Sequence, residues 1–146
     1  MSSALLQSPR AVLHSSESQE WYTRQPISDA ARRVLGRIDL DPASSPAANE
    51  IVCAGHYFTP ADDGLAQRWY GRVWLNPPYG KTGNKSNQEI WAQQLLAEYR
   101  AGNVREAILL VNAATDTTWF RALWDYPICF PTGRIKFWRP GAPADY

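Results

Sequence analysis

The stretch VWLNPPYGK at positions 73–81 constrains the fold of this chain more than any other part of the sequence. An apolar run typical of a buried strand ends there at Asn76 and two consecutive prolines. Proline has no backbone N–H and cannot donate to a sheet ladder, so Pro77 and Pro78 must end the strand. The sequence therefore predicts a strand that delivers Asn76 to its carboxyl end, followed by a rigid turn and the ring of Tyr79.

Helical and strand patterns alternate along the chain on both sides of this turn. After Pro26, apolar residues recur at the spacing of one helix face, and Gly36 stands where a helix commonly ends. The run at 106–113 is typical of a strand buried on both faces, and Thr115 or Asp116 is placed to cap the helix that follows. The predicted elements are a helix at 27–35, a strand at 37–42, a short helix beginning within 43–50, a loop at 55–69, a strand at 72–76, a helix at 88–100, a strand at 106–113, a helix within 115–124 and a hairpin over 128–138.

This alternation predicts an α/β fold: a Rossmann-like open sheet with helices on both faces and an antiparallel hairpin at its C-terminal end. A length of 146 residues suits one domain with its own core. Residues 1–19 are rich in serine and lack a regular apolar period, so we expect a flexible tail there. The domain is expected over residues 20–146.

Composition narrows the classes of protein that remain. The chain is 45% apolar and 20% charged, which is typical of globular domains, and its net charge of +1 means that a nucleic-acid partner would need a local basic patch. Two cysteines and two histidines, scattered along the chain, are too few for a structural zinc site. No run approaches the roughly 20 apolar residues of a membrane span. We therefore expect a cytoplasmic protein with reduced cysteines and with neither metal nor membrane.

The turn after the strand has a specific chemical use in such a sheet, because ligands of open α/β sheets bind beyond the carboxyl ends of the strands. The Asn76 side-chain oxygen and a proline carbonyl of the Asn–Pro–Pro segment are two acceptors that match the two hydrogens of an exocyclic amine. Tyr79 offers a face for stacking a planar base, which must first leave the duplex stack. Acceptors on both N–H groups favour a tetrahedral nitrogen whose lone pair points outward, toward an electrophile. A plain loop turn remains the alternative.

Six blocks of the sequence, taken in order, resemble the phage-type, Dam-like DNA adenine-N6 methyltransferases. They are EWYT, IDLDPASSPAAN, YFTPADDGLAQRW, GRVWLNPPYG, EAILLVNAATDTTWF and ICFPTGRIKF, and the resemblance extends from Glu20 to Phe137. It implies S-adenosylmethionine as the methyl donor and double-stranded DNA as the substrate. It also implies methyl transfer to N6 of a flipped-out adenine, with Asn76, Pro77, Pro78 and Tyr79 as the catalytic turn, in an enzyme encoded by a phage or prophage of a bacterial host.

The same resemblance implies which residues hold the donor. The EWYT segment is similar to an N-terminal donor-binding segment, and LDPASS stands where related enzymes have a glycine-rich turn. An aspartate of DDGL is placed like the acidic residue that contacts the donor's adenine. Simpler structural roles remain open. Thr23 could cap a helix, Asp39 and Asp41 could be strand-end aspartates, and DDGL could be an ordinary Asp–Gly turn. The implied donor-binding residues are Trp21, Thr23, Asp39, Asp41, Pro42, Ser44 and Asp63.

Basic residues in two places are candidates for contact with DNA phosphates. Lys81 and Lys85 follow the catalytic turn, and Arg134 and Lys136 lie on the predicted hairpin; ordinary exposed charge is the alternative. Compared with the family pattern, the chain stops soon after GRIKF. We therefore expect a C-terminally shortened sheet with a strand edge open to another chain.

Three other functions compete with adenine methylation. The same two acceptors would hold the side-chain amide of a glutamine, as in protein-glutamine N-methyltransferases. A prophage remnant with a broken donor site would be an inactive DNA-binding protein. A cytosine-N4 methyltransferase shares the geometry but usually has Ser or Asp in place of Asn76.

Overall fold

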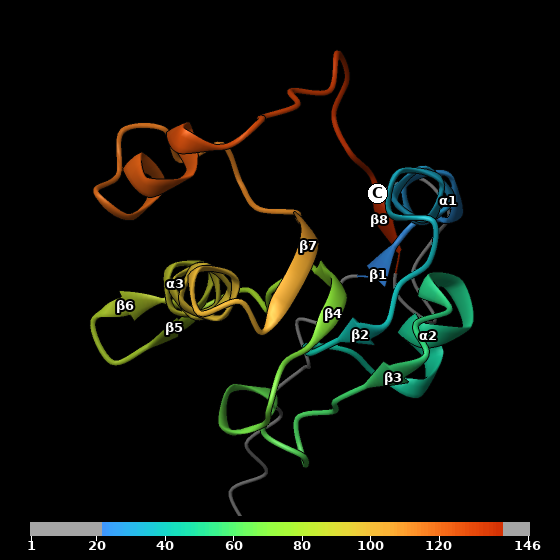
Figure 1. Ribbon diagram of the computed structural model, residues 1–146. Helices are drawn as coiled ribbons and strands as arrows, with labels where there is room; N and C mark the ends of the chain where they lie inside the picture. Colours follow the sequence, from blue (N-terminus) through green and yellow to red (C-terminus); the bar gives the residue numbers. More distant parts are fainter. Residues whose placement is uncertain (1–21, 139–146) are drawn as a thin grey trace, which may run out of the picture.

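The computed structural model describes residues 22–138, so the predicted tail at 1–19 and Trp21 lie outside the described residues. A parallel four-stranded sheet in the order β3-β2-β4-β7 forms the centre of the domain (Figure 1). Its strands are β2 (Leu40–Asp41), β3 (His56–Tyr57), β4 (Gly71–Leu75) and β7 (Val104–Leu109). The predicted α/β class with a central parallel sheet is thus confirmed.

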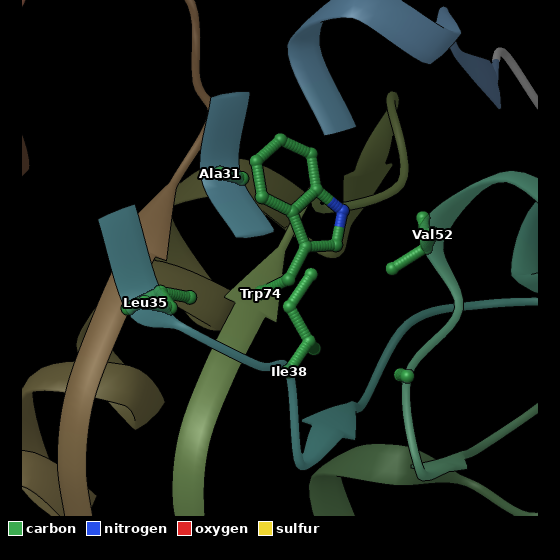
Figure 2. Packing of buried hydrophobic residues seen from close by; sticks show 6 residues of the cluster. Ala31, Leu35, Ile38, Val52 and Trp74 are labelled. Atoms are coloured by element: carbon green, nitrogen blue, oxygen red, sulfur yellow. The ribbon is translucent and has the colours of Figure 1, made fainter. Parts of the chain in front are cut away.

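Helices α1 (Gln25–Leu35) and α2 (Pro46–Val52) lie on one side of the sheet, and α3 (Asn87–Arg100) lies on the other (Figure 1). Strand β4 is the central element because its side chains alternate between the two layers. Trp74 packs with residues of α1 and α2, as Figure 2 shows, whereas Val73 and Leu75 pack with Leu95 of α3. The apolar run before the two prolines is therefore buried on both faces.

Local signals in the sequence explain where these helices begin and end. Pro26 lies in the first turn of α1, and Gly36 follows the helix with a φ of 77°. Ser45 caps α2 by accepting a hydrogen bond from the N–H of Ala48, and Ser86 caps α3 in the same manner. The predicted helix ends near Pro26 and Gly36 are confirmed.

The C-terminal half differs from the prediction in strand β7 and in the helix after it. Within residues 22–138, β7 pairs with β4 alone, and Arg105, Glu106 and Ala107 are exposed, so the expectation of burial on both faces was wrong. The next helix is the short 3-10 helix η2 (Trp119–Asp125), which starts four residues after Thr115. Thr117 forms a turn instead, with its N–H and hydroxyl both donating to the Ala114 carbonyl.

The predicted C-terminal hairpin does not form. Residues 128–130 are not a strand, and β8 (Phe137–Trp138) pairs antiparallel with β1 (Tyr22–Thr23). Aromatic contacts stabilise this pairing, because the ring of Trp138 packs on Tyr22 with centroids 5.5 Å apart. The segment after η2 therefore carries the chain from the α3 side to the α1 side (Figure 1). The sequence patterns also missed β3, which lies in the predicted loop at 55–69.

Candidate active site

A cavity of about 370 Å³ opens at the carboxyl edge of the central sheet. Strands β2 and β4 are parallel neighbours, with Leu40 opposite Val73, so the residues that follow them come together at this edge. Segments from β1, α2, the loop after β3 and α3 complete its wall. Of the residues proposed from the sequence, the cavity brings together Thr23, Asp41, Pro42, Ser44, Asp63, Asn76, Pro77, Pro78 and Tyr79.

The side chain of Asn76 is oriented by a residue far away in the sequence. Its Nδ2 donates to Oγ1 of Thr23 at 3.3 Å, and Thr23 is 96% buried in β1. Because the nitrogen and oxygen of a carboxamide point in different directions within its plane, this bond fixes the direction in which the acceptor oxygen points. The pairing of β1 with β8 holds Thr23 in this place.

Asp41 places a carboxyl group in the wall of the cavity with only 3% of the residue exposed. Burial raises its pKa to about 7, against the smaller opposing effects of the Ala43 N–H and the nearby Ser44 hydroxyl. None of the described residues that line the cavity is basic, so nothing in its wall neutralises the carboxylate. A cationic or hydrogen-bond-donating ligand would stabilise the charged form.

The hydroxyl of Ser44 is a second polar group that points to a ligand. It is buried and makes no hydrogen bond of standard geometry with the residues at 22–138. Buried polar groups in native structures normally have a partner, in the protein, in solvent or in a ligand. Ser44 and Asp41 together therefore form a polar end of the cavity.

Aromatic side chains form the other part of the wall. Tyr79 is half-buried, and burial raises the pKa of its phenol. Its ring and the ring of Phe137 pack in a T-shaped arrangement with their centroids 6.2 Å apart. Trp91 of α3 stacks on the buried Trp69 at 6.0 Å and reaches the cavity, as does Trp74 of β4. Trp74 and Trp91 were not among the site residues proposed from the sequence.

The DDGL motif forms the rim of the cavity. Asp62 accepts hydrogen bonds from the N–H and hydroxyl of Thr59, which lowers its pKa and leaves Asp63 as the aspartate on the cavity wall. Gly64 is required for close approach, because a Cβ there would lie 2.0 Å from the carbonyl oxygen of Pro42. This glycine thus brings the DDGL loop against the turn after β2.

Asp39, which was proposed from the sequence as a donor ligand, does not line this cavity. It lies at the opposite, amino end of the strands, where its carboxylate accepts from the Arg72 N–H at 2.8 Å and from Nε of Arg37 at 2.6 Å. Burial alone would raise the pKa of Asp39, but these hydrogen bonds and the two positive charges outweigh it and lower the pKa. Asp39 fixes the start of β4, at Gly71, rather than the ligand site.

We expect Asp39→Ala to destabilise the fold without changing donor binding. The substitution leaves the Arg72 N–H without its acceptor, which costs about 1–2 kcal/mol in the free energy of unfolding. Asp39→Asn retains an acceptor of the same shape and should show a smaller loss. Urea denaturation and donor-binding calorimetry measure the two effects, and a weakened donor affinity in a stable Asp39→Ala protein would contradict this assignment.

The four basic residues proposed for phosphate contact are exposed, and none of them lines the cavity. Lys81 and Lys85 lie on β5 (Lys81–Thr82) and β6 (Lys85–Ser86), and Lys85 is 3.7 Å from Glu89. Arg134 and Lys136 lie in the segment that leads to Phe137, the residue in contact with Tyr79. In the part of the chain that the structure describes, no helix has the length and apolarity to cross a membrane, and no group of three potential metal ligands is clustered.

Comparison with known proteins confirms the resemblance seen in the sequence. A family model described as DNA N-6-adenine-methyltransferase (Dam) matches residues 10–145. A search of curated proteins and a search of solved structures each gave no match. Because the family match covers nearly the entire chain, the protein belongs to the DNA N-6-adenine-methyltransferase (Dam) family.

Proposed function

We propose that this protein transfers a methyl group from S-adenosylmethionine to N6 of an adenine flipped out of double-stranded DNA. The observation that carries the proposal is that Asp41 and Asn76 line one cavity at the carboxyl ends of adjacent parallel strands. One is a buried carboxyl without a basic partner in the wall, and the other is a carboxamide held in one orientation. Family membership supplies the class of substrate.

The donor end of the cavity fits the polar groups of S-adenosylmethionine. The cavity volume lies within the range of small-molecule sites, and the buried Asp41 and Ser44 side chains match an amino group or ribose hydroxyls. Asp63 at the rim would accept from the donor's adenine, and Trp91 offers it an apolar wall. When bound, S-adenosylmethionine supplies an electrophilic methyl group.

The acceptor end would be formed by the catalytic turn, residues 76–79. The Asn76 oxygen and a proline carbonyl accept hydrogen bonds from the two N–H groups of the amine, which raises the electron density available at N6. The hydrogen bond to Thr23 keeps the oxygen of Asn76 in place, so less reorganisation accompanies the reaction. Tyr79 stacks on the extruded base and holds N6 in line with the methyl group. After transfer the methylated nitrogen releases one proton to solvent, and the demethylated donor, S-adenosylhomocysteine, is the leaving product.

The test is incubation with labelled S-adenosylmethionine and unmethylated duplex DNA, followed by nucleoside analysis. We expect the label in N6-methyldeoxyadenosine. Label in N4-methyldeoxycytidine or in glutamine of added protein would contradict the proposed acceptor. Donor binding measured by calorimetry identifies an inactive remnant, which would bind the donor only at millimolar concentration or not at all.

We expect Tyr79→Ala to reduce methylation much more than Tyr79→Phe, because the proposed role is stacking by the ring. Loss of a stacked base costs about 1–3 kcal/mol, which corresponds to roughly 5- to 150-fold in base capture. Tyr79→Phe keeps the ring and should stay within about threefold of wild type. Duplexes with 2-aminopurine at the target position report capture directly by fluorescence, and equal losses in both variants would exclude stacking as the role.

A further inference from the structure

A small polar hairpin, residues 81–86, leaves the catalytic turn directly after Gly80. Strands β5 and β6 pair antiparallel, with Lys81 opposite Ser86 and Thr82 opposite Lys85. Gly83 has a φ of 60°, which places glycine at the first central position of the two-residue turn, as in type II′ hairpins. Residues 81–85 are exposed and include no apolar side chain. Figure 1 shows this hairpin projecting beside α3.

One side chain joins this hairpin to the catalytic turn. Nδ2 of Asn87, the first residue of α3, donates to the carbonyl of Tyr79 at 3.0 Å. Its Oδ1 accepts from the hydroxyl of Thr82 at 2.7 Å, and its backbone N–H donates to the Gly80 carbonyl at 2.9 Å. Asn87 therefore fixes the hairpin, the turn and the start of the helix relative to one another.

Packing does not explain why the chain builds this hairpin. An isolated two-stranded hairpin is marginally stable in water, and this one has no apolar face to bury against α3. Its two ionisable residues, Lys81 and Lys85, are both basic, although the whole chain has a net charge of only +1. The charge and the shape together fit a polyanionic groove, and the major groove of DNA admits a two-stranded ribbon.

We propose that this hairpin enters the major groove of the duplex beside the target adenine, and that Asn87 is the positioning residue that couples its placement to Tyr79. The inference rests on the proposed function and adds a docking surface and a residue outside the cavity. Lys81 and Lys85 contact phosphates at the groove edges, while Asn84 at the hairpin turn reaches toward the bases. Docking of the hairpin is transmitted through Asn87 to the backbone of Tyr79, which faces the extruded base.

Two variants separate the two hydrogen bonds of Asn87. Thr82→Val removes the bond to the hairpin and keeps the bond to Tyr79, so we expect the KM for duplex DNA to rise about five- to tenfold with kcat retained. Asn87→Asp keeps an acceptor for Thr82 and loses the donor to Tyr79, so kcat and the 2-aminopurine signal should fall at least tenfold with KM within about threefold. A purely structural role would not divide KM from kcat in this manner.

Salt dependence and groove protection test the docking surface itself. The double variant Lys81→Ala/Lys85→Ala should lower the slope of log affinity against log salt by about 2, because two phosphate contacts are lost. The matched control Arg33→Ala/Arg100→Ala removes two exposed charges remote from the turn and should leave the slope unchanged. Wild type should protect guanine N7, a major-groove atom, from dimethyl sulfate next to the target, and the lysine variant should not.

The outcomes distinguish this inference from the proposed function. If wild type methylates adenine in DNA but the lysine variant keeps the wild-type slope and protection, the hairpin does not enter the groove. If Thr82→Val and Asn87→Asp both behave as wild type in KM and kcat, Asn87 does not couple the two parts. If wild type transfers no methyl group to DNA, the proposed function fails and this inference fails with it.

Discussion

Asn76→Ala is expected to abolish methyl transfer while the protein still binds S-adenosylmethionine with nearly wild-type affinity. The substitution removes an acceptor that acts on the target amine as positive charge develops on its nitrogen. Loss of one preorganised group of this kind costs about 10²–10³ in rate. In the proposed function the donor occupies the other end of the cavity, which Asp41 and Ser44 line, so calorimetry should show little change in its binding.

Thr23 provides the matched control for this prediction. Thr23→Val removes the hydroxyl that accepts from Nδ2 of Asn76 while it keeps the volume of a residue that is 96% buried. We expect an intermediate loss of kcat, because the acceptor oxygen remains but is less firmly oriented, and Thr23→Ser should restore activity. If Asn76→Ala keeps more than about a tenth of wild-type turnover, the carboxamide does not act on the amine.

The end of β4 and the turn at residues 76–79 were predictable from the sequence because their constraint is covalent. Two prolines end a strand whatever surrounds them, so the position of Asn76 at a strand end followed from local chemistry. The convergence of Asp41 with Asn76 required only that their strands be parallel neighbours, which the alternation of helices and strands implies. These residues were therefore identified without knowledge of any long-range side-chain contact.

The features that the sequence patterns missed depend on contacts between distant segments. The pairing of β8 with β1 joins the two ends of the described chain, and no local period encodes it. Asp39 immediately precedes β2 and Asp41 is its last residue, yet their side chains serve opposite edges of the sheet. Their spacing in the sequence did not predict that Asp39 would accept a hydrogen bond from Arg72 while Asp41 lines the cavity.

Asp41→Asn is expected to weaken donor binding strongly and, at the same time, to stabilise the ligand-free protein at pH 8. Burial raises the pKa of Asp41 from its ordinary 3.8 to about 7, so the fold at pH 8 contains a charged carboxylate in an unfavourable place. A rise of roughly three pKa units corresponds to at most about 4 kcal/mol in the free energy of unfolding. Asparagine has nearly the same shape, keeps an acceptor for the Ala43 N–H and carries no charge.

The raised pKa of Asp41 determines how the stability of the wild-type protein changes with pH. Because the folded pKa of Asp41 is higher than the unfolded value, the native state binds more protons than the unfolded state between about pH 4 and 7. The contribution of Asp41 to wild-type stability is therefore greatest below about pH 4, decreases as the pH rises, and is lowest above about pH 7. The stability difference between Asp41→Asn and wild type should accordingly shrink as the pH is lowered from 8 to 5, which urea denaturation at both values measures.

Donor binding should follow the opposite trend in the same protein. A ligand that donates hydrogen bonds or positive charge to Asp41 requires the ionised carboxylate, so wild-type affinity should rise with pH up to about 7 and then level off. In Asp41→Asn the affinity should be low and independent of pH over the same range. A variant that binds S-adenosylmethionine as tightly as wild type would exclude Asp41 from the donor site. A variant less stable than wild type at pH 8 would show that the buried charge already has a compensating partner in the fold.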